Sequence, residues 1–119
     1  MKHIPKLIVF LFVLNIVGCV PPTLYNWGNY SSTLYSYKKD PNDKNLTEHK
    51  KSLDEIVTVS ARNGKNVPPG VFAELGFYLI KEGKQSEGEV YFAKEVKLYP
   101  ESKIFIDKLL GGFKNGGKK

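Results

Sequence analysis

Cys19 is the only cysteine in the chain, so it is the only residue that could serve as a thiol nucleophile or a thiolate metal ligand. It follows two lysines at positions 2 and 6, an apolar run over residues 7–17 and the small residue Gly18. A positively charged start, a short apolar stretch and a small residue are typical of a secretory signal peptide. The setting of this cysteine therefore predicts a processing site rather than a redox or catalytic thiol.

The segment Ile16-Val17-Gly18-Cys19 resembles the lipobox of bacterial lipoproteins, whose cysteine is acylated and becomes the first residue. The resemblance implies a signal peptide over residues 1–18, with diacylglycerol and an N-linked acyl chain on Cys19. Val20 stands where an aspartate would resemble an inner-membrane retention signal, which implies a lipid-anchored protein of the outer membrane, on the periplasmic face. The alternatives are a core segment or a retained anchor, although a membrane-crossing helix needs about 20 apolar residues.

The net charge and the length of the mature chain limit how many domains it can form and what it can bind. Loss of residues 1–18 removes two lysines and no acid, so the formal charge falls from +6 to +4. The remainder is long enough for one domain with a modest core. Its lysine pairs are scattered, which favours a solvated surface or attraction to anionic headgroups over nucleic-acid binding.

Other residues with chemical potential are few. His49 is the only histidine after residue 18, and its charged neighbours Glu48 and Lys50 predict that it is solvated. Asp54 and Glu55 are adjacent on a predicted helix, so they point about 100° apart and cannot form a matched acid–base pair. With the one thiol acylated, a zinc site would lack ligands. We therefore predict no enzyme activity, no metal, no small-molecule substrate and no cofactor beyond the acyl chains.

The secondary-structure elements that would position these residues are predicted to be helices. No segment alternates with period two over the length of a strand, so the fold class is predicted as all-α. An aromatic stripe with helical spacing predicts a first helix that ends at a turn over residues 40–43. The stripe consists of Trp27, Tyr30, Leu34 and Tyr37. Core packing is the favoured interpretation of Trp27 and Tyr30, and contact with the membrane interface is the alternative.

Capping and breaking residues predict the remaining boundaries. Asn45 is predicted as the N-cap of the second helix, and residues 63–65 and 82–84 are predicted to end the second and third helices. The third helix is predicted to have proline in its first turn, at Pro68-Pro69, and the fifth to run from the cap Ser102 through Leu110. The fourth is predicted over residues 86–99, and its inward residues are Val90, Phe92, Ala93 and Val96. The predicted organisation is a tether over 19–23, a helical domain over 24–110 and a flexible basic tail over 111–119.

Residues 69–102 resemble a tetratricopeptide repeat, a helix–turn–helix unit of about 34 residues. In that register Gly76 and Gly88 would let two helices approach closely, while Phe72 and Phe92 fill the space between them. Glu95 stands where the repeat usually has alanine, and we predict that it pairs with a neighbour such as Lys103 or faces solvent. A helical hairpin without repeat ancestry is the alternative.

Most of the chain, residues 24–110, also resembles a small Gram-negative lipoprotein family, domain of unknown function 4810. The matching motifs are Tyr25-x-Trp27-Gly28-x-Tyr30, Val67-Pro68-Pro69-Gly70, Ala73-Glu74-Leu75-Gly76 and Glu95 followed by Tyr99-Pro100-Glu101-Ser102. The family has no established activity, and the resemblance implies genes beside a curli-secretion-channel-like lipoprotein and another small lipoprotein. Glu95 fits this family's pattern, which makes it a candidate for a specific structural bond.

These patterns together predict a non-enzymatic outer-membrane lipoprotein in which tetratricopeptide-like hairpins with flanking helices dock other envelope proteins. The residues predicted for interaction or packing are Trp27, Tyr30, Phe72, Gly76, Phe92 and Glu95. A structural membrane-surface lipoprotein without a dedicated protein partner is the alternative.

Overall fold

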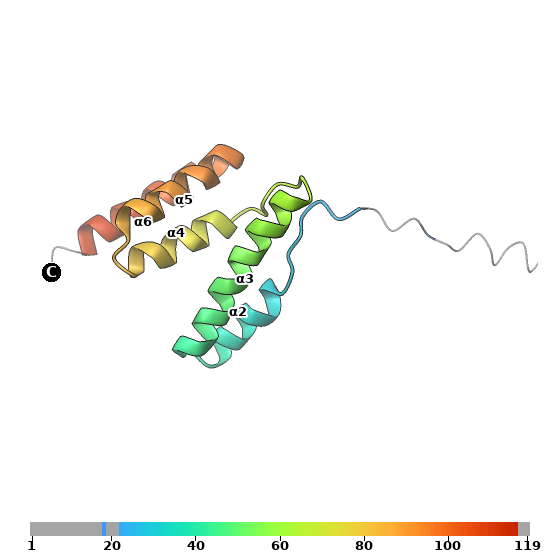
Figure 1. Cartoon of the computed structure of the whole chain (residues 1–119). Coiled ribbons are helices and arrows are strands. Elements are labelled where there is room, and N and C mark those ends of the chain that lie inside the picture. The colour runs from blue at the N-terminus through green and yellow to red at the C-terminus, as the bar shows by residue number, and fades with distance from the viewer. Residues whose placement is uncertain (1–17, 19–21, 117–119) are drawn as a thin grey trace, which may run out of the picture.

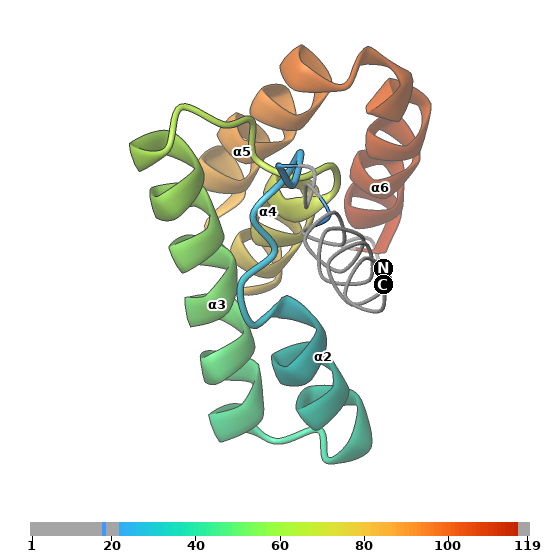
Figure 2. The same ribbon diagram turned by 90° about the vertical axis from the view of Figure 1, so that its right-hand side faces the viewer.

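The computed structural model describes Gly18 and residues 22–116, and within this part all regular structure is helical. The elements are α2 (Tyr30–Lys39), α3 (Asp43–Arg62), α4 (Val71–Lys81), α5 (Gln85–Leu98), a 3₁₀ turn η2 (Pro100–Ser102) and α6 (Lys103–Gly116). Helices α2 and α3 form one antiparallel hairpin, α4 and α5 form a second, and α6 packs against the second (Figures 1 and 2). The all-α prediction is confirmed for the described residues. The predicted signal peptide and Cys19 lie outside them, apart from Gly18.

The turn between α2 and α3 falls where the sequence predicts it, but the cap of α3 is a different residue. The side chain of Asn42 accepts a hydrogen bond from the Asn45 amide at 2.8 Å, so Asn42 is the N-cap and α3 begins at Asp43. Asn45 lies inside the helix, and its side-chain amide donates to the Asp40 carbonyl at 2.8 Å. Asn42 has the extended backbone that a cap requires (φ −131°, ψ 166°), which explains the correction.

Helix α4 begins later than its prolines suggest. Gly70 has a φ of 92°, a left-handed conformation that glycine adopts without strain, and the helix starts at Val71. Pro68 and Pro69 therefore precede the helix instead of forming its first turn. Pro68 is fully buried, so this segment also contributes to the core.

The second hairpin is held together by a glycine contact. A Cβ on Gly76 would lie 2.8 Å from the Gly88 carbonyl oxygen and 2.8 Å from the Phe92 ring. A Cβ on Gly88 would lie 2.5 Å from the Ile80 side chain. Helices α4 and α5 thus approach as closely as the sequence predicts for these two glycines, and a larger residue at either position would force them apart.

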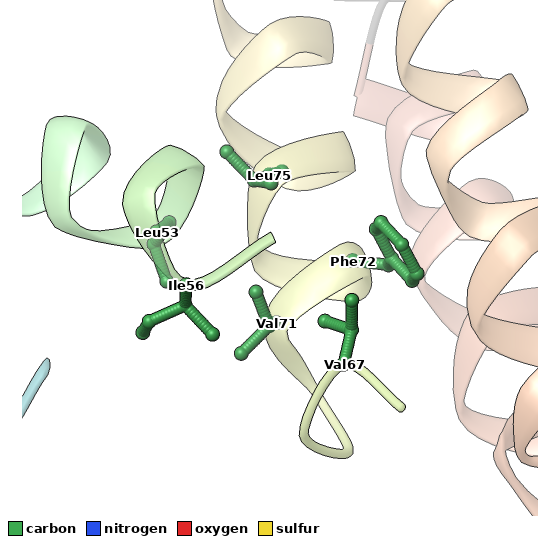
Figure 3. Packing of buried hydrophobic residues seen from close by; sticks show 6 residues of the cluster. All are labelled: Leu53, Ile56, Val67, Val71, Phe72 and Leu75. Carbon is green, nitrogen blue, oxygen red and sulfur yellow. The ribbon is translucent and has the colours of Figure 1, made fainter. Parts of the chain in front are cut away.

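Buried apolar residues form two clusters. The first joins α3 to the start of α4 and consists of Leu53, Ile56, Val67, Val71, Phe72 and Leu75 (Figure 3). The second joins α4, α5 and α6 through Ala73, Ile80, Phe92 and Ile106. Val90 and Ala93 were predicted to face inward, but both are exposed. The glycine contact fixes the inward face of α5 along Gly88, Phe92 and Glu95, which turns both residues outward.

Helix α6 extends further than predicted. It continues to Gly116, past the predicted domain end at residue 110 and into the predicted flexible tail. Ile106, Leu109, Leu110 and Phe113 follow helical spacing on one face and pack on the second cluster, which explains why the helix persists through Gly111 and Gly112. Ser102 does not show the predicted cap bond, because its hydroxyl donates to the Tyr99 carbonyl at 2.7 Å.

Candidate docking surface

A trough lined by half-buried and exposed apolar side chains runs between α4 and α6. It consists of two adjoining hollows of about 470 and 340 Å³ that share Phe77 and Leu109. The first hollow also contains Phe113, and the second contains Phe105, which is 57 % exposed. Helix α6 supplies one wall and α4 the other, and the rings of Phe77 and Phe113 lie 5.6 Å apart between their centroids. The arrangement is suited to binding an apolar segment.

Two lysines line the first hollow, which lies towards the α4 C-terminal end of the trough. Lys81 is in the last turn of α4, with its Nζ 5.8 Å from the centre of the Phe77 ring, and Lys108 projects from α6. Within the described part of the chain, neither lysine has an acidic group within 4 Å. The first hollow is therefore positively charged.

A buried polar cluster lies behind the opposite end, where Glu74 borders the trough. His49 on α3 is 0 % exposed, and its Nε2 lies 2.8 Å from Glu74 Oε1. Its Nδ1 lies 2.9 Å from Thr33 Oγ1, which in turn lies 2.9 Å from Ser52 Oγ. The Tyr30 hydroxyl donates to the second carboxylate oxygen of Glu74 at 2.9 Å. The cluster ties α2, α3 and α4 together.

The prediction that His49 is solvated is wrong, and the physical reason is helical geometry. Successive helical residues point about 100° apart, so the charged neighbours of His49 in sequence say nothing about its own face. The informative spacing was with Ser52, Leu53, Ile56 and Ser60, which lie three, four, seven and eleven positions on and are all buried. The same spacing would have placed His49 in the interior.

A hydroxyl, an imidazole and a carboxylate in a row are also the parts of a nucleophilic site. Here the two hydroxyls lie within helices: Thr33 Oγ1 contacts the carbonyls of Asn29 and Tyr30, and Ser52 donates to the His49 carbonyl. Backbone amides within a helix donate to the preceding turn, so they are not free to stabilise an oxyanion. The hydrogen bonds of the cluster join three helices.

The same environment suppresses ionisation of the neighbouring tyrosines. Burial, followed by the charge of Glu74 and the hydrogen bond to it, raises the pKa of Tyr30 to about 12. Burial is likewise the largest cause of a raised pKa at Tyr78, whose hydroxyl donates to Glu74 at 3.3 Å. Both phenols remain protonated donors to the carboxylate at neutral pH.

Glu95 makes the structural bond for which it was a candidate, though not with the predicted partner. It is 2 % exposed, and its carboxylate accepts from the Gly70 amide at 2.7 Å and the Ala73 amide at 3.3 Å. A residue of α5 therefore caps the N-terminus of α4, where Gly70 has no side chain to do so. The predicted alternatives, pairing with Lys103 or facing solvent, are both wrong.

The other predicted interaction or packing residues divide between core and surface. Phe72, Gly76 and Phe92 are buried between helices. Trp27 lies before α2 rather than on it and is 41 % exposed, because the helix begins at Tyr30. Its ring lies 5.3 Å from that of Tyr30, which packs against the first cluster. None of these residues lines the trough. Its large apolar residues are not among those that the sequence analysis predicted for interaction or packing; they are Phe77, Phe105, Leu109 and Phe113.

Two further properties concern metals and membranes. Within residues 22–116, no group of three or more His, Cys, Asp or Glu side chains is arranged to hold a metal ion. None of the described helices combines the length and the apolar character that crossing a bilayer requires.

Comparison with known proteins places the chain in a family. Neither the curated proteins nor the solved structures contain a match to this sequence. A family model does match, and it spans residues 24–109, from before α2 into α6. The match covers well over half of the chain and includes both helical hairpins, the buried polar cluster and much of the trough. The chain therefore belongs to the family described as domain of unknown function DUF4810.

Proposed function

We propose that this protein is a non-enzymatic lipoprotein of the outer membrane that docks another envelope protein. In this proposal the signal peptide over residues 1–18 is removed, and acyl chains on Cys19 hold the helical domain at the periplasmic face. The lipobox-like segment before Cys19 supports the anchor. The observation that carries the docking role is the exposed apolar trough between α4 and α6.

We further propose that the second hairpin is a tetratricopeptide-like unit. Helices α4 and α5 and the turn η2 fall within residues 69–102, the segment that resembles one repeat. The close contact of Gly76 with Gly88 and the burial of Phe72 and Phe92 support the proposal. A single unit cannot bury its own apolar face, so the first hairpin and α6 act as its covers.

The proposed partner is the curli-secretion-channel-like lipoprotein that the family resemblance implies. The test is to express the tagged full chain together with this partner and to purify the complex from outer membranes. We expect the partner to co-purify at a defined ratio. Failure to recover it, or equal recovery with an unrelated outer-membrane lipoprotein as bait, would sink the docking proposal.

The anchor has a separate test. The full chain should incorporate labelled palmitate and fractionate with the outer membrane, and the Cys19→Ser variant should do neither. Label that persists in the variant, or wild-type protein that stays in the inner membrane, would contradict the proposed location.

A membrane-surface role without a protein partner is the second candidate, and the exposed residues near the anchor favour it. Leu24 is 75 % exposed and Trp27 is 41 % exposed, only a few positions after Cys19. Aromatic and aliphatic side chains at such a position suit the bilayer interface. Binding of the Cys19→Ser protein to anionic vesicles, weakened by salt and by Trp27→Ala, would support this role.

A further inference from the structure

We propose that the trough between α4 and α6 binds an amphipathic segment of the partner protein whose acidic half lies over the first hollow, at Lys81 and Lys108. The apolar side chains of that segment would pack on Phe77, Leu109 and Phe113. This inference rests on the proposed docking function and adds where the partner binds and what chemistry it presents.

The floor of the trough sets the apolar part of the ligand. Phe77, Leu109 and Phe113 are only half-buried, although all three pack against the second core cluster. Phe105 adds an exposed ring at the Glu74 end. From Phe105 to Phe113 the helix rises by about 12 Å, which matches roughly two turns of a ligand helix. Two or three apolar side chains on one face would fill that length.

The charged side chains that line the trough set the orientation in which the segment binds. Nearby acids already have partners: Glu82 pairs with Lys50 and Lys84, and Asp107 pairs with Lys103. At the opposite end, Glu74 is held by His49 and two tyrosine hydroxyls. Lys81 and Lys108 thus make the first hollow the positive half of an apolar trough. Such pairs contribute modestly to affinity but select the sign and orientation of the partner.

Glycines on α6 leave the trough open. Gly112 and Gly116 line it, and a Cβ on either residue would meet nothing within 4 Å. Glycine inside a helix costs about 1 kcal/mol relative to alanine. A side chain at residue 112 would therefore start in open space and extend into the trough, which makes this position a direct test.

The experiment uses the lipid-anchored protein reconstituted into nanodiscs of neutral lipid. The probes are two fluorescent helical peptides of about three turns, with leucines along one face and either a pair of glutamates or a pair of lysines at one end. We expect the acidic peptide to bind roughly tenfold more tightly than the basic one, because attraction at two lysines is exchanged for repulsion. The double variant Lys81→Glu/Lys108→Glu should reverse this preference.

Gly112→Leu provides the blocking variant and Gly111→Leu its matched control. Gly111 is on the same helix, does not line the trough, and also has open space around a Cβ. Gly112→Leu should weaken binding of the acidic peptide at least about tenfold while Gly111→Leu leaves it unchanged. Equal binding of the two peptides, no binding, equal effects of the two leucines, or a concentration-dependent dimer that buries the trough would overturn the inference.

Co-purification with the proposed partner separates this inference from the docking function itself. If the Gly112→Leu protein still recovers the partner as wild type does, docking stands and the trough is not its site. If wild type recovers nothing, the docking function fails. Loss of the partner with Gly112→Leu but not with Gly111→Leu supports both.

Discussion

The imidazole of His49 and the carboxylate of Glu74 lie 2.8 Å apart and connect the first helical hairpin to α4. The two residues are 25 positions apart, and the histidine is fully buried. Because a buried polar group without a partner is costly, each residue depends on the other to remain in place. The bond also fixes the orientation of α4, and hence of one wall of the trough.

Removing the imidazole should destabilise the fold. His49→Ala leaves a cavity and deprives Glu74 and Thr33 of a partner, so we expect a loss of about 2–4 kcal/mol in the free energy of unfolding. Urea denaturation followed by circular dichroism measures it. Lys51→Ala, exposed on the same helix, is the control and should change stability by less than about 0.5 kcal/mol. A similar small change for His49→Ala would contradict the proposed role of the cluster.

The cap that Glu95 provides should be as sensitive. Glu95→Ala leaves a cavity and deprives the Gly70 and Ala73 amides of their acceptor, and we expect a loss of about 2–4 kcal/mol in the free energy of unfolding. Glu95→Gln retains one acceptor and should lose about half as much. Faster hydrogen exchange at the Gly70 and Ala73 amides is the local signature. Glu89→Gln removes an exposed charge from the same helix and should leave both amides protected.

Because Gly76 lies in the close contact of α4 and α5 and Gly111 does not, alanine at these two positions should change the free energy of unfolding in opposite directions. Gly76→Ala places a Cβ against the Gly88 carbonyl and the Phe92 ring, so we expect a net loss of about 1–3 kcal/mol despite better helix propensity. Gly111→Ala meets open space and should gain up to about 1 kcal/mol. Thermal unfolding of the two variants checks both signs, and a stabilised Gly76→Ala would show that the hairpin is more loosely packed.

Alkaline pH should weaken the fold through Tyr30. Its pKa is raised from 10.0 to about 12 in the folded state, so stability from the protonated phenol is present below pH 10 and is lost as pH rises towards 12. Tyr30→Phe should lower stability at neutral pH by about 1 kcal/mol and make the alkaline decline shallower. Denaturant midpoints measured across this window provide the test. Tyr35→Phe, at an exposed position, should leave the decline unchanged.

Local signals in the sequence predicted most of the helix boundaries. The turns near Asp40, Asn63 and Gly83 and the end of α5 before Pro100 all carry residues that disfavour a continued helix, and each is present in the structure. The close approach at Gly76 and Gly88 was predictable because only glycine permits it. These features depend on a few neighbouring residues or on a recognised register.

Contacts between distant residues were not predictable in the same way. Glu74 lies 25 positions from His49, Gly70 lies 25 positions from Glu95, and nothing near either residue identifies these partners. The end of α6 was missed for a related reason, since Phe113 holds its last turns through contact with Phe77 on another helix. The trough arises from two helices together, so neither segment alone predicts it.

A lysine near the end of the first hairpin restricts how far the domain can reach. The Lys65 side chain donates to the carbonyl of Thr23 at 2.7 Å, which ties the incoming chain to the loop between α3 and α4. Four residue steps separate Thr23 from Cys19, a span of at most about 14 Å when fully extended. If Cys19 carries the acyl chains, the loop between α3 and α4 is held close to the surface of the membrane leaflet. Any partner must then come to the membrane, because the domain cannot leave it to meet one.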